Sequence, residues 1–398
     1  MNACTPTSSA WTRWSHHKRQ LCRVAGIFAV TAVLVGCVAI VRESDLVVRI
    51  GAASDVAQAT EVGLEVLDGN GSAADAVVAM AMMMAVTRPD AVGIAGGGTC
   101  LVFDPEEKTT RLIDFPAEPA GGGAAVPGFL RGLSAIHADY GQLRWSEMVA
   151  IAETSLRIAP PGTDSAGRTA GERLALADSM AAIRVGGIQA FYEGPLGRSY
   201  AEGVQARGLS LSFDQIRASR IAWQEPATAP FGNNLVSFGP AIGGRGIRLV
   251  EAFQAAAAGQ PLPGGRPAGQ GLVAVAMSGD DMAVTCGFGF SPVQGGATAG
   301  DTGIPIGGPT PELPSIAIHY NEPVAVPIDM LGSTEAATVF GGTVETAAAS
   351  GLATDTIPAS SRLTGLICAW NRGSDLQCRG VADPRFGGYG LVTETLLQ

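Results

Sequence analysis

Three nucleophilic side chains fall close together in one predicted hairpin, at Ser278, Thr285 and Cys286. A hydroxyl or thiol attacks a carbonyl only when a base lies within hydrogen-bonding reach and is itself held in place. The candidate bases beyond the basic N-terminal stretch are His137, in a predicted helix, and His319, at the end of a predicted strand. The sequence positions of the two histidines do not place either one beside the three nucleophilic side chains. The sequence therefore predicts no nucleophile–histidine–acid triad, and we expect both histidines at ordinary core or surface positions.

A run of glycines at 93–98 is the other motif that suggests a ligand. A Gly-rich turn binds phosphate when it follows a strand and opens a helix, because the helix N-terminus then points its N–H groups at the anion. Here the run precedes a predicted strand, 99–103, which is the wrong order. We therefore expect close backbone packing at these glycines. No cysteine or histidine spacing indicates a metal site, so the sequence predicts neither metal nor cofactor.

The N-terminus has the order of an export or membrane signal. Basic residues and histidines precede an apolar run, 24–41, that is long enough to cross a bilayer. Within it, residues 34–37 resemble a bacterial lipobox, in which Cys37 becomes the lipidated first residue of the mature chain. A lipoprotein, an uncleaved transmembrane anchor and a coincidental core helix all remain open. The first two would hold the rest of the chain at the membrane, on the periplasmic side of a bacterial cell envelope.

Four cysteines after the signal bear on whether the chain is exported. Cys368 and Cys378 flank a predicted hairpin turn, and an oxidising compartment would favour a disulfide between them. Two free thiols are the alternative, because a Cα separation cannot be read from sequence. Cys100 and Cys286 lie in apolar, Gly-rich surroundings, so we expect buried structural thiols there.

Composition narrows the class of protein. The chain has 398 residues, of which 46% are hydrophobic and 16% charged, which predicts a globular core. A net charge of −10 argues against a nucleic-acid partner, because phosphate binding needs a basic face. After an anchor at 1–41, short apolar strands alternate with helices in a single predicted domain, 42–398. One such helix, 73–86, follows the cap residue Ser72 and is so apolar that it must be enclosed.

Strands 272–276 and 282–285 form a predicted hairpin joined at Ser278 to Asp281. Helices are predicted at 127–140, 145–158 and 171–188. Stacked sheets flanked by helices are the architecture that this order favours.

Five separated motifs resemble the γ-glutamyltranspeptidase family, and they occur in the family's order. They are Gly69 to Val77, Gly93 to Gly98, Ala125 to Gly128 with Tyr140 to Trp145, Phe191 to Leu196, and Ala382 to Gly390. The resemblance covers nearly all of the chain after the signal. It implies an α+β fold, the αββα sandwich of the N-terminal-nucleophile hydrolases.

The resemblance also implies where the chemistry should lie. In this family a Thr becomes N-terminal by self-cleavage and attacks a γ-glutamyl carbonyl, its α-amine serves as base, and glycine N–H groups hold the oxyanion. Alignment on the predicted hairpin puts Gly269 at that Thr, within a Pro/Gly-rich loop at 258–271. Gly269 has no nucleophile.

Other family positions are also replaced. Pro116 stands where the family has a carboxylate-binding Arg, and Thr310 and Pro311 stand where it has paired serines. Glu335 and Ala336 replace the oxyanion glycines, and Glu335 would repel an anion. Ser278, Thr285 or Cys286 would each need a new cleavage to become a chain terminus.

These replacements favour a pseudoenzyme: a membrane-anchored γ-glutamyltranspeptidase homologue that is a binding or assembly subunit. The alternative is a divergent γ-glutamyltransferase or hydrolase acting on glutathione or other γ-glutamyl amides. An active member cuts itself into two chains, whereas the first hypothesis predicts one. The glycine-rich segment 295–308 is expected either to contact a protein partner or to be disordered.

Overall fold

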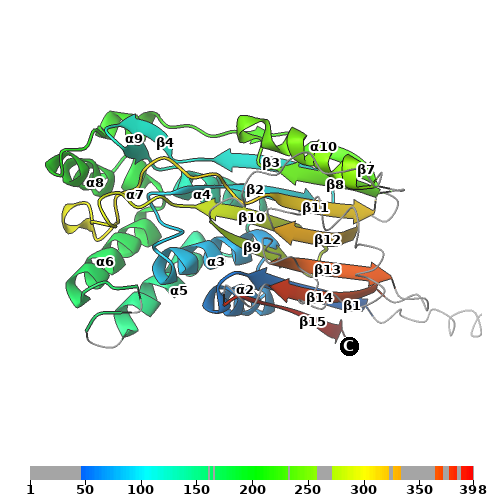
Figure 1. The fold of residues 1–398 in the computed structure, drawn as a ribbon. Helices are drawn as coiled ribbons and strands as arrows, with labels where there is room; N and C mark the ends of the chain where they lie inside the picture. Colours follow the sequence, from blue (N-terminus) through cyan, green and yellow to red (C-terminus); the bar gives the residue numbers. More distant parts are fainter. Residues whose placement is uncertain are drawn as a thin grey trace, which may run out of the picture. The chain divides into compact units, whose positions relative to one another are not determined.

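Two antiparallel sheets carry the fold, and helices flank them (Figure 1). The computed structural model describes residues 46–159, 162–164, 166–231, 234–257, 271–321, 326–332, 364–370, 376–382 and 387–397. The first sheet has the strand order β15-β1-β9-β10-β2-β3-β6. Its strands are β1 (Leu46–Ser54), β2 (Gly97–Asp104), β3 (Thr109–Phe115), β6 (Trp223–Gln224), β9 (Leu272–Met277), β10 (Ala283–Gly289) and β15 (Tyr389–Leu397).

The second sheet has the order β14-β13-β12-β11-β8-β7. Its strands are β7 (Ala227–Phe231), β8 (Asn234–Gly239), β11 (Ile316–Asn321), β12 (Val326–Gly332), β13 (Thr364–Trp370) and β14 (Leu376–Ala382). A separate small hairpin consists of β4 (Glu118–Gly121) and β5 (Ala124–Val126). The predicted hairpin of β9 and β10 is confirmed, with Thr285 opposite Val275.

The two sheets pack against each other through an apolar layer. The first sheet contributes Leu101, Phe103, Val273 and Val275, and the second contributes Ile316, Ile318 and Leu366, all at most 1% exposed. Successive side chains of a strand point to opposite faces. The alternate residues of the first sheet, Cys100, Val102, Ala274 and Ala276, therefore belong to a second core beneath the helices. Each large side chain buried in these layers contributes about 1.5–3 kcal/mol.

Helices make the outer layers of the sandwich. Three helices pack on the first sheet: α2 (Ala57–Asp68), α3 (Ala73–Thr87) and α4 (Phe129–Tyr140). The other helices on this side pack on α3 and on one another: α5 (Trp145–Ile158), α6 (Ala170–Gly186), α7 (Gln189–Tyr192), α8 (Pro195–Ala206) and α9 (Phe213–Ala218). Helix α10 (Arg245–Ala257) packs on β7 and β8 of the second sheet. This arrangement is the predicted αββα sandwich (Figure 1).

Helix α3 is enclosed, as its composition predicts. Every residue from Ala73 to Val86 is buried, against β9 and β10 on one side and neighbouring helices on the others. Ser72 Oγ accepts the Asp75 N–H at 3.1 Å, and Asp75 Oδ2 accepts the Ser72 N–H at 3.0 Å. The same carboxylate oxygen accepts the N–H groups of Gln142 at 2.8 Å and Leu143 at 3.0 Å. Asp75 therefore caps α3 and fixes the α4–α5 loop to it.

The segment 295–308 packs within its own molecule, so the expectation of disorder is wrong, and contact with a protein partner stays a prediction. Ala299, Ile304 and Ile306 are fully buried. Ser179 Oγ, on α6, donates to the Thr302 carbonyl at 2.6 Å. The apolar residues between the glycines bury against α6 and α8, and this burial holds the segment in place.

Candidate functional site

The candidate site lies at the end of the first sheet where β9 begins. Leu272 pairs with Phe288, and Gly289 pairs with Gly97. The start of β9, the end of β10 and the start of β2 therefore lie at the same end of the sheet, which we call the β9 end. The family resemblance puts the processing site just before β9, so a family-type nucleophile would lie here.

Glycines at the β9 end leave room for a loop of the same chain. A Cβ built on Gly287 would lie 3.3 Å from Pro314, and one on Gly289 would lie 2.9 Å from Leu313. Leu313 and Pro314 are buried. At Gly271, where φ is +138°, a Cβ would strike the Phe288 carbonyl. The loop that contains Leu313 and Pro314 therefore packs directly against the β9 end.

The structure places Thr310 beside Ala117, the residue that follows Pro116. Thr310 Oγ1 accepts the N–H of Ala117 at 2.6 Å, and the Thr310 N–H donates to the Ala117 carbonyl at 3.0 Å. Pro311 packs against Gly289. The hydroxyl that replaces a family serine is thus bonded to the backbone next to Pro116.

The cavity that Pro116 lines holds about 20 Å³, which is room for about one water molecule. Two arginines line the same cavity. Arg131 Nε donates to Ser219 Oγ at 2.7 Å, and the guanidinium lies 3.9 Å from the Tyr192 ring centroid. Burial lowers the pKa of Arg131. Arg220 Nη1 donates to two backbone carbonyls at 2.6 and 2.7 Å. Both cations beside Pro116 are therefore engaged by the protein itself.

A polar group that the sequence analysis missed is centred on Arg245, the first residue of α10. Its guanidinium pairs with Glu312 Oε1 at 2.5 Å, and its Nε donates to Ser315 Oγ at 3.3 Å. The Arg245 side chain is 11% exposed and that of Glu312 is 38% exposed. Glu312 follows Thr310 and Pro311, so an acid and a cation of this chain meet in a segment that the family uses for substrate. No local pattern links residues so far apart in the sequence.

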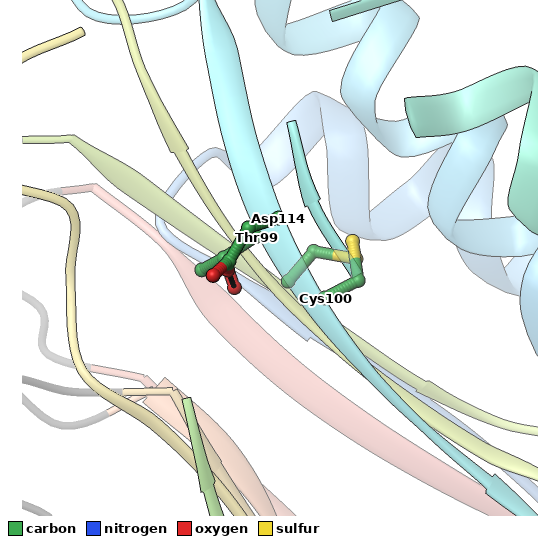
Figure 2. The surroundings of a disulfide bond; sticks show 4 residues. Thr99, Cys100 and Asp114 are labelled. Carbon is green, nitrogen blue, oxygen red and sulfur yellow. Dashed lines mark hydrogen bonds between the residues drawn. A yellow bond between two sulfur atoms is a disulfide. The ribbon is translucent and has the colours of Figure 1, made fainter. Parts of the chain in front are cut away.

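Asp114, on β3, is a buried acid near the β9 end. Its Oδ1 accepts Thr99 Oγ1 at 2.6 Å (Figure 2). Its Oδ2 accepts the N–H groups of Ala241 and Ile242, both at 3.0 Å, just before α10. Desolvation raises the pKa of Asp114, and these hydrogen bonds oppose that rise. Asp114 therefore joins the two sheets through three donors.

The three nucleophilic groups of the β9–β10 hairpin have other structural roles. Ser278 Oγ donates to Asp280 Oδ1 at 2.6 Å in the turn. Thr285 is fully buried, and its strand partners Val275 and Leu101 point between the sheets, so Thr285 shares that face. Cys286 is bonded to another cysteine.

A disulfide joins Cys100 of β2 to Cys286 of β10 (Figure 2). The two residues are directly opposite in the register, with Cα atoms 4.1 Å apart. The predicted burial is confirmed, but the two thiols are not free. Sequence spacing did not reveal the bond, because 186 positions separate the residues. Cys368 and Cys378 are also opposite each other in the backbone register of β13 and β14, and a bond between them remains a prediction.

Both histidines outside the N-terminal stretch lie at structural positions. His137 Nε2 is 2.9 Å from the Leu143 carbonyl and 3.6 Å from Asp75 Oδ1. His319 is 1% exposed on β11. Ile318 points between the sheets, so its neighbour His319 points to the other face of β11, away from the face that Thr285 shares.

Several predicted site residues lie outside the described residues: Gly269, Glu335, Ala336 and Cys37. Within the ranges given above, no three His, Cys, Asp or Glu side chains gather as metal ligands. In that same part of the chain, no helix combines the length and apolarity needed to cross a bilayer.

The architecture is that of the N-terminal-nucleophile hydrolases. A cephalosporin acylase from Bacillus halodurans superposes with a TM-score of 0.67, covering 88% of this chain and 96% of that chain at 13% sequence identity. At such low identity the likeness concerns the fold alone.

Sequence comparisons find relatives of parts of this chain. Residues 59–124 match the model of gamma-glutamyltranspeptidase. Glutathione hydrolase 7 from Homo sapiens is 36% identical over 116 residues, which are 25% of this chain and 17% of that protein. Glutathione hydrolase 5 proenzyme from Rattus norvegicus is 24% identical over 293 residues, 60% of this chain and 51% of that protein. These matches cover at most about half of either relative. Over these stretches the chain is similar to the γ-glutamyltranspeptidase family.

Proposed function

We propose that this protein is a γ-glutamyltranspeptidase homologue that neither cleaves itself nor transfers γ-glutamyl groups, and that it is a binding or assembly subunit. The carrying observation is the start of β9. The strand begins with Leu272 and Val273 and is preceded by Gly271, and none of these three residues has a nucleophilic side chain. Acyl transfer by this fold needs a hydroxyl or thiol at the head of that strand, with an amine beside it.

The surroundings of the β9 end support the proposal. Pro116 offers no charge, and the Thr310 hydroxyl is bonded to Ala117. The carboxylate of Glu312 would repel the α-carboxylate of a γ-glutamyl substrate unless Arg245 outweighed it. The sequence adds Glu335 near the expected oxyanion position, where a second negative charge would oppose the transition state.

Divergent hydrolysis of γ-glutamyl amides is the alternative, and the relatives named glutathione hydrolases favour it. The test is glutamate release from glutathione and from a chromogenic γ-glutamyl anilide, with the purified full chain. We expect no release above the uncatalysed rate. Turnover that disappears in Ser278→Ala or Thr285→Val would overturn the proposal and identify the nucleophile.

We also propose that residues 1–41 anchor the protein to the membrane, with Cys37 as the lipidated residue. The Cys100–Cys286 disulfide supports export, because such bonds persist in oxidising compartments. The test is the intact mass of protein extracted from bacterial membranes. A lipid-sized mass increase that Cys37→Ser abolishes supports lipidation. An unmodified full-length chain in the membrane supports a transmembrane anchor, and recovery in the soluble cytoplasmic fraction contradicts both.

An assembly role predicts a stable partner. Gentle detergent extraction followed by affinity capture of the tagged chain should recover a stoichiometric second protein. Recovery of this chain alone, as a monomer, would count against that role while leaving the absence of catalysis untouched.

A further inference from the structure

The Cys100–Cys286 disulfide lies in the middle of the first sheet, and neither cysteine is exposed. It belongs to a row across four strands, in which Ala274 of β9, Cys286 of β10, Cys100 of β2 and Ile113 of β3 are opposite one another in turn. All four residues are 0% exposed. Residues opposite one another in a sheet share a face, so an apolar side chain flanks the bond on each side along the row.

Helices cover the face to which this row points. The Cys100 side chain points toward the helices, whereas Thr99 lies on the other side of the strand (Figure 2). Helix α3 packs on β9 and β10, and α4 packs on β2 and β3, so these two helices contact all four strands of the row. Every residue of α3 from Ala73 to Val86 is itself buried. The disulfide is therefore enclosed by the helical layer as well as by the sheet.

The neighbours of the bond along the strands are also apolar. Side chains two residues apart in a strand share a face, and here they are Val102 on β2 with Val284 and Phe288 on β10, all 0% exposed. The Phe288 ring meets the edge of Phe129, on α4, with the ring centroids 5.7 Å apart. None of these neighbours carries a charge, so a thiolate among them would be a buried, unpaired charge, which is costly.

Thiol chemistry at this bond needs access to a sulfur atom. A thiolate breaks a disulfide by attacking one sulfur, and the other sulfur leaves as a thiolate. In the folded protein, an incoming thiolate would have to displace α3 or α4 from the sheet to reach either sulfur. Formation of the bond needs the same access, because a disulfide-bearing oxidant must first react with one of the two cysteines. Both reactions therefore require the helical layer to open.

We propose that the Cys100–Cys286 bond is made before the helical layer closes over the first sheet, and that closure then locks the bond against thiols. In the forming reaction, the thiolate of one cysteine attacks the disulfide of an oxidant, which gives a mixed disulfide and one oxidant thiolate. The second cysteine thiolate then attacks the sulfur of the first cysteine, forms the protein bond and releases the second oxidant thiolate. Two electrons pass to the oxidant, and the two protein thiols lose their protons to solvent.

The lock fixes the redox state of this pair at the moment of folding. A chain that folds among disulfide oxidants carries the bond, and one that folds where thiols stay reduced keeps two enclosed thiols. The bond is therefore a fixed part of the fold and does not switch with the redox conditions around the folded protein. The inference concerns the face of the sheet beneath the helices, so it stands apart from the catalytic question at the β9 end.

The first test compares reduction of the bond in the folded and the unfolded chain. The full chain, refolded with oxidised glutathione, is treated with dithiothreitol in native buffer and in guanidinium, and peptide mapping after alkylation measures the thiols of Cys100 and Cys286. We expect reduction in native buffer to be at least about a hundredfold slower, because it waits for the helical layer to open. Equal rates, or two free thiols in the refolded chain before reduction, would overturn the proposal.

The second test starts from the reduced, denatured chain. It is refolded with a phosphine reductant, which is removed before oxidised glutathione is added, and circular dichroism follows folding. We expect a folded chain whose two thiols stay free until guanidinium opens it. A chain that folds only once oxidised glutathione is present would likewise support formation of the bond before closure. A folded dithiol that oxidises as fast as the unfolded chain would contradict the lock.

A substitution in α4 tests whether the helical layer controls the rate. Phe129 is fully buried, and Phe129→Leu weakens the packing of α4 on the sheet. We expect its reduction in native buffer to be about tenfold faster than in the parent, with an unchanged rate in guanidinium. Ala138→Ser, at an exposed position of the same helix, is the matched control and should be reduced at the parent rate. If Phe129→Leu is reduced no faster than this control, thiols reach the bond without opening the layer and the proposal fails.

Discussion

The region around α3 and the β9 end use buried polar groups in different ways. At α3, one oxygen of Asp75 accepts the N–H groups of Ser72, Gln142 and Leu143, and these bonds hold a helix and a loop in place. At the β9 end, Thr310 is bonded to Ala117 and Glu312 to Arg245, at positions where the family resemblance expects contacts with substrate. The first region uses its polar groups to hold elements of the fold together. The second keeps the fold while its polar groups bind one another.

Under the proposed function, this difference explains how the chain retains the architecture without the family's chemistry. The residues that hold the sandwich together are satisfied inside the molecule and do not depend on a ligand. The substrate-binding positions face no such structural demand, so other side chains can replace them while the sheets still pack.

The largest expected effect is at Asp75. Asp75→Ala leaves several buried N–H groups without an acceptor, so we expect the free energy of unfolding to fall by about 3–5 kcal/mol. Urea or guanidinium denaturation measures it. Asp68→Ala, an exposed acid at the end of α2, is the control and should change stability by less than about 0.5 kcal/mol. An Asp75 variant as stable as the control would remove the distinction between the two regions.

A smaller effect is expected for the disulfide. Replacing Cys100 and Cys286 together by Ala should cost about 2–4 kcal/mol, since the bond constrains a long loop of the unfolded chain. Denaturation of the parent with and without reductant, beside the double variant, measures it. If the parent and variant unfold at the same denaturant concentration under oxidising conditions, the bond does not stabilise the sheet.

The smallest effect concerns pH, at Asp114. Its pKa is raised above the usual 3.8 by burial, so the folded state holds its proton more tightly than the unfolded state does. The stability from this group is therefore complete below the unfolded pKa and is lost as pH rises through the folded one. Relative to Asp114→Asn, the parent should lose stability as pH rises from about 3.8.

Unfolding free energies of the parent and Asp114→Asn across this pH range test the sign. Asp214→Asn, at a side chain that is 89% exposed, is the matched control and should track the parent. A parent that gains stability over Asp114→Asn with rising pH would mean that the three hydrogen bonds to Asp114 outweigh its desolvation.

Local sequence patterns predicted much of the sandwich. The boundaries of α5 and the start of α3 agree with expectation, because a helical period and a Ser cap are local signals. Strand β15 was missed, since its place beside β1 depends on a partner far away in the chain. The segment 295–308 was misjudged because a glycine-rich composition does not reveal that its few apolar residues are buried.

The candidate site was predictable only in part. The family resemblance named Pro116 and Thr310, but the hydrogen bond between Thr310 and Ala117, next to Pro116, came only from the structure. The Arg245–Glu312 pair and the Cys100–Cys286 bond could not be predicted, since each joins residues on separate elements and neither spacing follows a local rule. Long-range pairing is settled by how the sheets and helices pack, and single-sequence patterns do not contain it.

The most direct test of the central claim is the covalent state of the purified full chain. Mass spectrometry of the denatured, reduced protein should find one polypeptide that runs unbroken through 258–271 and β9. Two fragments, the second beginning with Thr, Ser or Cys, would contradict the claim and return the chain to the self-processing enzymes of its family.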